Sequence, residues 1–298
     1  MKRAALISIL IMLAASAMAD DDGVPRRTTA SDNTGLSVFV NIGALWADDY
    51  SANFYSGKEG NKNTILRVLH SQRDGDAIWT HLKNTGLINS SIGSYNDLRV
   101  EEYPEMYYKT TYQVGLGFRY DYASGFGWLV RFDIAKMQAV GAFNLGSTNS
   151  ASILTQNRYI RCGMLGKEDR INIDLAMAKS VELNENLCLE LNLGVNVNNT
   201  KVTENVMEIQ GPTWSILDVW NGQEPYVGIA EYSYQNQGGI GYGVFMSGFL
   251  GYRVSGMGAI KLGYTCYHTR TTLEGYSAMG WHHCMNLRFE INNFSFIS

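Results

Sequence analysis

The stretch that decides the fold is YYKTTYQVGLGFRYDY, which runs from Tyr107 to Tyr122. Every second residue from Tyr108 to Tyr120 belongs to one face, which is apolar and aromatic apart from a threonine. The residues between them combine glycines with charged groups such as Arg119. Strict alternation over this length is typical of a β-strand and not of a helix. We therefore expect one unbroken strand with an apolar face and a polar face.

The same alternation recurs along the rest of the chain. In the clearest case, residues 187–197, leucines and valines alternate with polar residues and a glycine. In 240–252 the pattern is less regular, because Phe245 and Phe249 interrupt the polar face. Each segment approaches the ten or so residues that a tilted strand needs to cross a bilayer. With Tyr107–Tyr122, the predicted strands number eight, the others being 36–46, 128–134, 171–177, 187–197, 240–252, 260–265 and 285–292.

The connections between these segments alternate between short and long. Tight, turn-forming sequences follow the second, fourth and sixth strands. Longer connections are expected at 47–106, 141–169, 199–238 and 270–281. An even number of strands then places every short turn at one end and every long loop at the other. The sequence predicts an all-β fold, an eight-stranded antiparallel transmembrane barrel, with a soluble secreted β protein as the alternative.

The chain begins with a basic, apolar and small-residue pattern, MKRAALISILIMLAASAMA. This pattern predicts a secretory signal peptide that is cleaved after Ala19. Its removal takes away Lys2 and Arg3 and no acid, so the net charge of −4 becomes −6. A negative chain is a poor partner for nucleic acid. We expect a short periplasmic segment at 20–35 and the barrel domain at 36–298.

The positions of the four cysteines in the sequence do not indicate a disulfide framework. Cys162 falls in a predicted loop, whereas Cys188, Cys266 and Cys284 fall in different predicted strands. We expect buried, unreactive free thiols.

As a pattern of strands and loops, the chain resembles the small outer-membrane β-barrel proteins of Gram-negative bacteria, the group that includes the OmpA and OmpX-type barrels. The family's last strand typically ends in an aromatic residue, and here Phe294 and Phe296 lie close to the end. The resemblance implies an outer-membrane location, with short periplasmic turns and long extracellular loops. It also implies outer-membrane lipid and lipopolysaccharide as surroundings, and no cofactor.

Two long loops contain residues that could contact a partner. In the first, Ile65, Leu66, Leu69, Ile78 and Leu82 are spaced for short amphipathic helices that cap the barrel mouth. The third loop is aromatic, and its rings could stack on a glycan or a protein or fold inward. These aromatic residues are Trp214, Trp220, Tyr226, Tyr232 and Tyr234.

The same rim also holds candidate acid–base groups. Asp48 and Asp49 end the first strand, and His282 and His283 begin the last. Barrel closure makes these strands neighbours, so a rim-located hydrolase is one hypothesis. No spacing typical of a zinc site is present, even with Cys266 and His268 nearby.

Charged residues on the polar faces are expected to pair inside the lumen. We predict a register in which paired residue numbers of the second and third strands sum to 252, so that Arg119 faces Asp133 and Asp121 faces Arg131. An eight-stranded barrel is only wide enough for its side chains to fill. A non-enzymatic scaffold that presents its loops is therefore the leading hypothesis, ahead of a passive pore. The predicted lumen network is Arg119, Asp121, Arg131, Asp133, Glu190, Lys261, Arg288 and Glu290.

Overall fold

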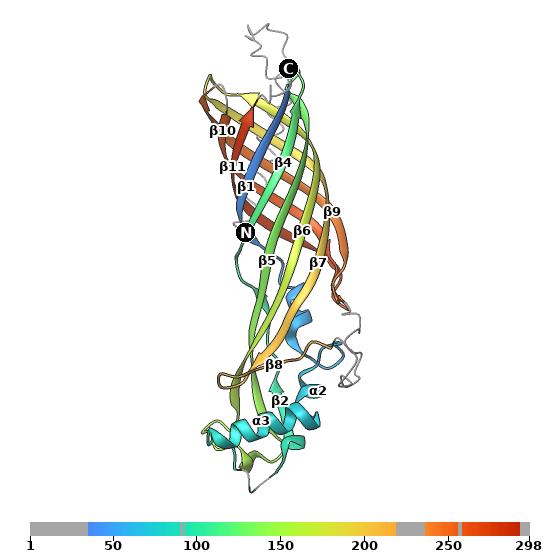
Figure 1. Cartoon of the computed structure of the whole chain (residues 1–298), viewed down its shortest axis with the longest axis vertical. Helices are drawn as coiled ribbons and strands as arrows, with labels where there is room; N and C mark the ends of the chain where they lie inside the picture. Colours follow the sequence, from blue (N-terminus) through green and yellow to red (C-terminus); the bar gives the residue numbers. More distant parts are fainter. Residues whose placement is uncertain (1–34, 90, 92, 219–235, 256–257, 293–298) are drawn as a thin grey trace, which may run out of the picture.

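The computed structural model describes residues 35–89, 91, 93–218, 236–255 and 258–292. Eight antiparallel strands hydrogen-bond side by side into a closed ring (Figure 1), which confirms the predicted barrel. The ring closes because β1 pairs with β11 on one side and with β4 on the other. In ring order the strands are β1 (Gly35–Trp46), β4 (Thr111–Asp121), β5 (Phe126–Ser147), β6 (Ile160–Glu182), β7 (Leu187–Glu208), β9 (Ile240–Ser255), β10 (Gly258–Thr271) and β11 (Ala278–Asn292).

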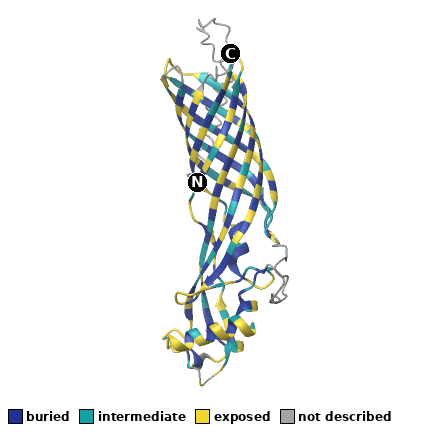
Figure 2. Ribbon diagram, viewed as in Figure 1, coloured by how far each residue is buried: buried dark blue, intermediate teal, exposed yellow. Residues whose placement is uncertain are grey.

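The two ends of the ring differ as predicted. At one end, which we name the turn end, β4 joins β5 through residues 122–125 and β6 joins β7 through residues 183–186. At the other end, the loop end, the connections at 47–110 and 209–239 are much longer. Between the ends, buried and exposed residues alternate along each ring strand (Figure 2), with apolar side chains outward and polar ones inward.

Three ring strands continue far past the loop end of the ring. β5, β6 and β7 have 22, 23 and 22 residues, and they form a three-stranded extension. β2 (Leu98–Glu102) adds to its β5 edge and β8 (Thr213–Ser215) to its β7 edge. The prediction that 47–106, 141–169 and 199–238 are loops is therefore wrong over 98–102, 141–147, 160–169, 199–208 and 213–215, which are strand.

The apolar face of these strands changes sides where the extension begins. On β5, Phe132 and Ile134 face outward and are exposed, while Arg131 and Asp133 are buried. Just beyond Ala135 the first exposed residue is Lys136, and the inward positions become apolar, with Met137, Ala139, Phe143 and Leu145 almost inaccessible. A prediction that looks for apolar residues at the outward positions therefore ends the strand at this inversion. The hydrogen bonds between β5 and β6 nevertheless continue beyond it.

Short helices cover the far end of the extension. They are α2 (Ile65–Leu69), α3 (Gln72–Asn84), η2 (Tyr95–Asp97) and η3 (Ser150–Ser152). The Ser71 side chain caps α3 by accepting a 3.1 Å hydrogen bond from the Asp74 N–H. Ile65, Leu69, Ile78 and Leu82 are fully buried, so the predicted amphipathic helices are confirmed. We name these helices, β2, β8 and the extension the distal module.

The position predicted for these helices is wrong, because they do not lie at the barrel mouth. α3 lies at the opposite end of the molecule from the turn end (Figure 1). A different element, η1 (Ser51–Ser56), packs against β3 (Tyr107–Tyr108), β5 and β6 where the extension leaves the ring. The amphipathic pattern therefore predicted helices correctly, whereas their location depends on the unpredicted extension.

The stretch Tyr107–Tyr122 is also interrupted, which corrects the expectation of one strand. β3 pairs with β5 as Tyr107 opposite Val140, and β4 begins only at Thr111. The interruption reverses the faces, so Tyr107 is exposed and Tyr108 is buried. Tyr108 points inward because it bonds to interior groups, whereas the alternation placed it on the outer face.

The β4–β5 register differs from the prediction. Tyr120 lies opposite Trp128 and Gly117 opposite Arg131, so paired residue numbers sum to 248 and not 252. The turn decides this register: the Tyr122 N–H donates to the Phe126 carbonyl at 2.7 Å, and Gly125 adopts φ +74°. A three-residue hairpin loop with a left-handed glycine is a favoured geometry, and it outweighs direct charge pairing.

No helix in the described ranges is long and apolar enough to cross a membrane. All four cysteines are buried free thiols, as expected, but Cys162 belongs to β6 and not to a loop.

Candidate functional site

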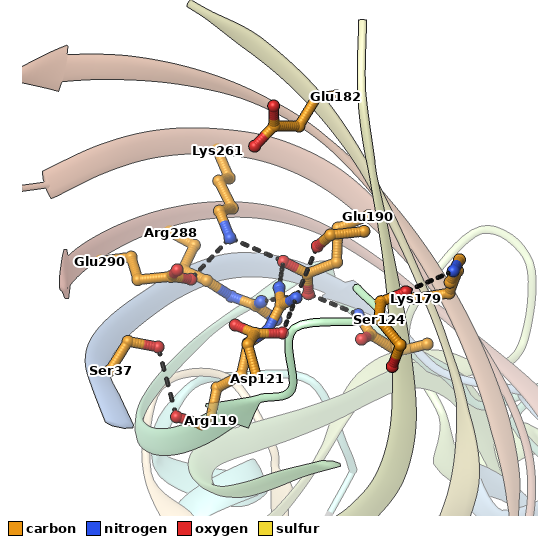
Figure 3. A network of polar contacts seen from close by, with 12 residues as sticks. Ser37, Arg119, Asp121, Ser124, Lys179, Glu182, Glu190, Lys261, Arg288 and Glu290 are labelled. Carbon is orange, nitrogen blue, oxygen red and sulfur yellow. Dashed lines mark hydrogen bonds and ion pairs between the residues drawn. The ribbon is translucent and has the colours of Figure 1, made fainter. Parts of the chain in front are cut away.

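The ring encloses a cluster of charged side chains near the turn end (Figure 3). Glu190 lies at its centre and accepts hydrogen bonds from Lys261 at 2.7 Å, from Arg288 at 2.6 Å and from Arg119. Arg119 also pairs with Asp121 at 2.6 Å. These contacts join six of the eight predicted lumen residues, three cations and three carboxylates, which are Arg119, Lys261, Arg288, Asp121, Glu190 and Glu290.

Aromatic rings and glycines complete the packing of this cluster. The Arg288 guanidinium carbon lies 4.1 Å from the centroid of the Phe39 ring and 3.9 Å from that of Phe249. Cation–π contact of this kind stabilises a guanidinium that has left water. A Cβ on Gly117 would lie 2.1 Å from the Phe39 ring, and one on Gly263 would lie 2.2 Å from Phe249. The two glycines therefore provide the space that the rings occupy.

A second charged group fills the middle of the lumen. Arg131 pairs with Asp133 at 2.8 Å and with Asp174, which lies directly opposite it on β6. The Tyr267 hydroxyl donates to Asp174 at 3.1 Å. Both predicted pairs, Arg119 with Asp133 and Asp121 with Arg131, are therefore wrong, because the register places glycines opposite Arg131 and Asp133. Sequence reasoning missed Asp174, although its alternation with Ile173 and Leu175 places it on the lumen face.

A third group lies where η1 closes the mouth of the ring. The Tyr55 hydroxyl donates to Glu168 at 2.6 Å, and the Tyr108 hydroxyl donates to the same oxygen at 3.2 Å. Arg170 donates to the other Glu168 oxygen at 2.5 Å. A Cβ on Gly166 would lie 2.2 Å from the Tyr55 ring, so glycine is needed for the ring to seat. Glu168 and Gly166 escaped prediction because 141–169 was assigned to a loop. Tyr55 lies in the predicted loop at 47–106, and the alternation placed Tyr108 on the outer face.

Burial determines the ionisation of the two mouth tyrosines. Removal from water raises the pKa of the Tyr55 and Tyr108 hydroxyls well above the usual value, and the nearby Glu168 charge raises both further. Both rings are therefore neutral donors at physiological pH. A neutral hydroxyl can hold the Glu168 carboxylate, so the three side chains fasten η1 to the ring.

Together the three groups block the lumen. Between the mouth and the middle group lies a cavity of about 20 Å³, lined by Arg170, Tyr267 and His282 among others. Such a volume has room for about one water molecule. The barrel interior is therefore a packed polar core, as expected for eight strands.

The candidate rim groups do not assemble into an acid–base pair. His282 is buried in the lumen, where its Nδ1 accepts the Asp48 N–H at 3.2 Å. His283 lies on the outer face, where its Nδ1 is 2.6 Å from the Tyr264 hydroxyl. One Asp49 oxygen accepts the Tyr108 N–H at 2.9 Å. Within the described ranges, no three His, Cys, Asp or Glu side chains are grouped to hold a metal ion.

The predicted contact aromatics are only partly described. Trp214 lies in β8, is half-buried, and has its ring centroid 5.8 Å from that of His81 on α3. It packs within the distal module, and its contact with a glycan or protein stays a prediction. Trp220, Tyr226, Tyr232 and Tyr234 lie outside the described residues.

A buried amide cluster binds the first long connection to the third. The Asn63 side chain donates to the Gln237 amide oxygen at 2.6 Å, and its own oxygen accepts the Asp218 N–H at 2.7 Å. The Gln237 amide also donates to the Asp218 carbonyl at 2.9 Å. Arg67 on α2 donates to the Ile216 carbonyl at 3.0 Å. Side-chain bonds of this kind hold the connections together as one folded unit.

No family model matches the chain, and no curated protein matches it. Among solved structures, Neisserial surface protein A (NspA) is 7% identical, with 87% of this chain and 98% of that one covered and a TM-score of 0.39. OprG from Pseudomonas aeruginosa is 8% identical over 87% and 97%, with a TM-score of 0.41. Ail of Yersinia pestis, in complex with the heparin analogue sucrose octasulfate, is 9% identical over 87% and 97%, with a TM-score of 0.35. The architecture of the chain itself, an eight-stranded ring with tight turns at one end and long connections at the other, is that of the small outer-membrane barrels.

Proposed function

We propose that the protein is inserted in the outer membrane through its ring strands and acts as a closed, non-enzymatic scaffold for the distal module. The observation that carries this proposal is the inversion of the apolar face at Ala135. Outward apolar side chains suit lipid, and inward apolar side chains with outward charges suit water. The turn end would then face the periplasm and the distal module the exterior.

The packed lumen favours a scaffold over a pore. A pore needs a continuous water path, whereas Arg119, Arg131 and Arg170 each lie in a separate buried group that crosses the interior. Opening such a path would break several buried ion pairs at once. We also expect no hydrolase activity at the rim, because His282 and His283 lie on opposite faces of β11.

The distal module gives this scaffold its surface for a glycan or protein partner. Its own apolar core lies between the extension and the helices, so it keeps a defined shape outside the ring. At its far end, Leu154 and Tyr159 are exposed beside η3, on a connection held by the pairing of Ile88 with Ile153. Ordered, exposed apolar and aromatic side chains are the groups that anchor protein partners.

Two measurements test the proposal. Cells that express the protein should carry it in the outer-membrane fraction, and external protease should cut the distal module while leaving a membrane-protected barrel. Purified protein in a planar bilayer should give no steady conductance. Recovery of the chain in a soluble fraction would overturn the location, and a steadily open channel would overturn the closed scaffold.

A further inference from the structure

The outer face of the β10–β11 hairpin differs from the rest of the ring surface. On the described ring strands, outward positions between the two ends are almost all apolar or aromatic. On β10, however, the outward positions nearest the loop end are His268 and Arg270, and on β11 His283 also faces outward. Titratable side chains on a lipid-facing surface are costly and are usually functional.

The position of these residues along the strand places them at the edge of the apolar belt. Eight residues separate Ile260, near the turn end, from His268. At about 3.4 Å per residue and a tilt of about 40°, this corresponds to roughly 20 Å along the barrel axis. An outer-membrane barrel has an apolar belt about 25 Å tall. His268 and Arg270 therefore lie at the level of the lipid headgroups on the loop side.

Aromatic side chains surround His268, Arg270 and His283. Trp281 lies directly opposite His268, with ring centroids 4.4 Å apart, and it is 53% exposed. His283 lies opposite Trp46 on β1, which is also exposed. Tyr242 on β9 is 61% exposed. Indole and phenol rings are suited to the boundary between lipid and water, where they contact acyl chains and headgroups together.

The Arg270 guanidinium, near the loop end of β10, differs in its partners from the cation at the turn end. No ion pair or side-chain hydrogen bond joins the Arg270 guanidinium to another side chain in the described part of the chain, and the Arg270 carbonyl accepts from Asn198 instead. By contrast, the turn-end cation Arg253 pairs with Glu182 at 2.7 Å. A guanidinium without an ion-pair partner at the level of the headgroups can bind a phosphate there. The planar guanidinium binds two oxygens of one phosphate in a bidentate manner.

We propose that His268, Arg270 and Trp281 form a binding site for the phosphate of a phosphorylated glycolipid in the outer leaflet. Arg270 holds the phosphate, His268 contributes a second donor, and the indole of Trp281 packs on the first acyl carbons. This inference rests on the proposed outer-membrane location and adds a specific lipid contact to it.

The test uses the folded, full chain purified in detergent and analysed by native mass spectrometry. Three probes are added separately: diphosphorylated lipid A, lipid A without its phosphates, and phosphatidylglycerol. The wild-type protein should retain diphosphorylated lipid A at least tenfold more than either other probe. The double variant His268→Gln with Arg270→Gln should lose this retention. Arg270→Lys, which keeps the charge, should retain a substantial part of it.

Arg253→Gln is the matched control, since it removes one cation at the other end of the ring, and its lipid retention should equal that of the wild type. Three results would overturn the proposal: equal retention in the double variant, equal retention of the dephosphorylated or the phosphatidylglycerol probe, or a protein dimer that the double variant abolishes. The last result would identify the patch as a contact between two copies. Because the experiment does not use cellular location, failure here with the protein in the outer membrane would leave the proposed function standing.

Discussion

Lys136 on β5 lies directly opposite Asp169 on β6, one row beyond the apolar pair of Ile134 and Ile171. Asp169 in turn lies opposite Lys201 on β7. A row of alternating charge therefore crosses three strands where the outward apolar surface ends. Opposite charges at directly opposed positions favour pairing on a water-exposed sheet. The row marks the boundary between the part of the ring suited to lipid and the extension suited to water.

The turn-end cluster should depend on Glu190 more than on any other carboxylate. Replacement by glutamine (E190Q) leaves Arg119, Lys261 and Arg288 buried with less counter-charge, and the loss of one member of such a group costs about 3–5 kcal/mol. We expect a marked fall in the urea midpoint for unfolding of the detergent-folded protein. Glu182→Gln is the control, because its pair with Arg253 is exposed and should contribute little. Equal midpoints in the two variants would contradict the central role of Glu190.

Neutralising either of the two carboxylates of the middle group, Asp133 or Asp174, should change the stability of the protein to a different extent. Asp174 accepts from Asn196 at 2.6 Å and from Tyr267 as well as pairing with Arg131. In the described part of the chain, Asp133 has one ion pair, to Arg131, with the Asn41 amide beside it. Two carboxylates share one guanidinium, so this group carries excess negative charge. Asp133→Asn should therefore leave the free energy of unfolding nearly unchanged, while Asp174→Asn should lower it by about 2–3 kcal/mol. A larger loss for Asp133→Asn would contradict this assignment.

The packing of the Tyr55 ring against the backbone of Gly166 should not tolerate a side chain at position 166. A Cβ there would enter the Tyr55 ring, so Gly166→Ala should destabilise the mouth by about 1–3 kcal/mol. Hydrogen exchange should then accelerate in residues 51–56 and remain slow in the ring strands. Gly163→Ala on the same strand is the control, since its Cβ would make an ordinary 3.5 Å contact with Glu208. Slow exchange in residues 51–56 of the Gly166→Ala variant would show that η1 does not depend on the packing of Tyr55 against Gly166.

The mouth should also loosen at alkaline pH. Because the pKa values of Tyr55 and Tyr108 are raised in the folded protein, their stabilisation is complete below the unfolded value of about 10 and is lost as the pH rises above it. The urea midpoint should therefore fall between about pH 10 and pH 12. Tyr55→Phe should flatten this fall, since phenylalanine does not ionise. An equally steep fall in the variant would assign the effect to other groups.

The sequence was sufficient to predict the ring and its topology, since alternation with an outward apolar face identified each ring strand. It did not predict the extension, because just beyond Ile134 the outward residues are Lys136 and Gln138, while apolar side chains turn inward. It placed Arg119, Glu190, Lys261 and Arg288 on lumen faces, but their partners depend on register. A single turn, with Gly125 in a left-handed conformation, sets the β4–β5 register and separates Arg131 from Asp121. The β5–β6 register places Arg131 opposite Asp174.

The most direct test of the account measures where lipid ends along β5 and β6. Spin labels are attached singly at positions 132, 134, 136 and 138 of β5, and at 169 and 171 of β6, in protein whose native cysteines are replaced by serine or alanine. The labelled barrels are folded into lipid vesicles, and collisions with oxygen and with a water-soluble nickel chelate are compared. We predict oxygen-dominated collisions at 132, 134 and 171, and nickel-dominated collisions at 136, 138 and 169. Uniform nickel access at all six positions would show that the ring does not face lipid, and it would contradict the account of a membrane barrel that carries the distal module.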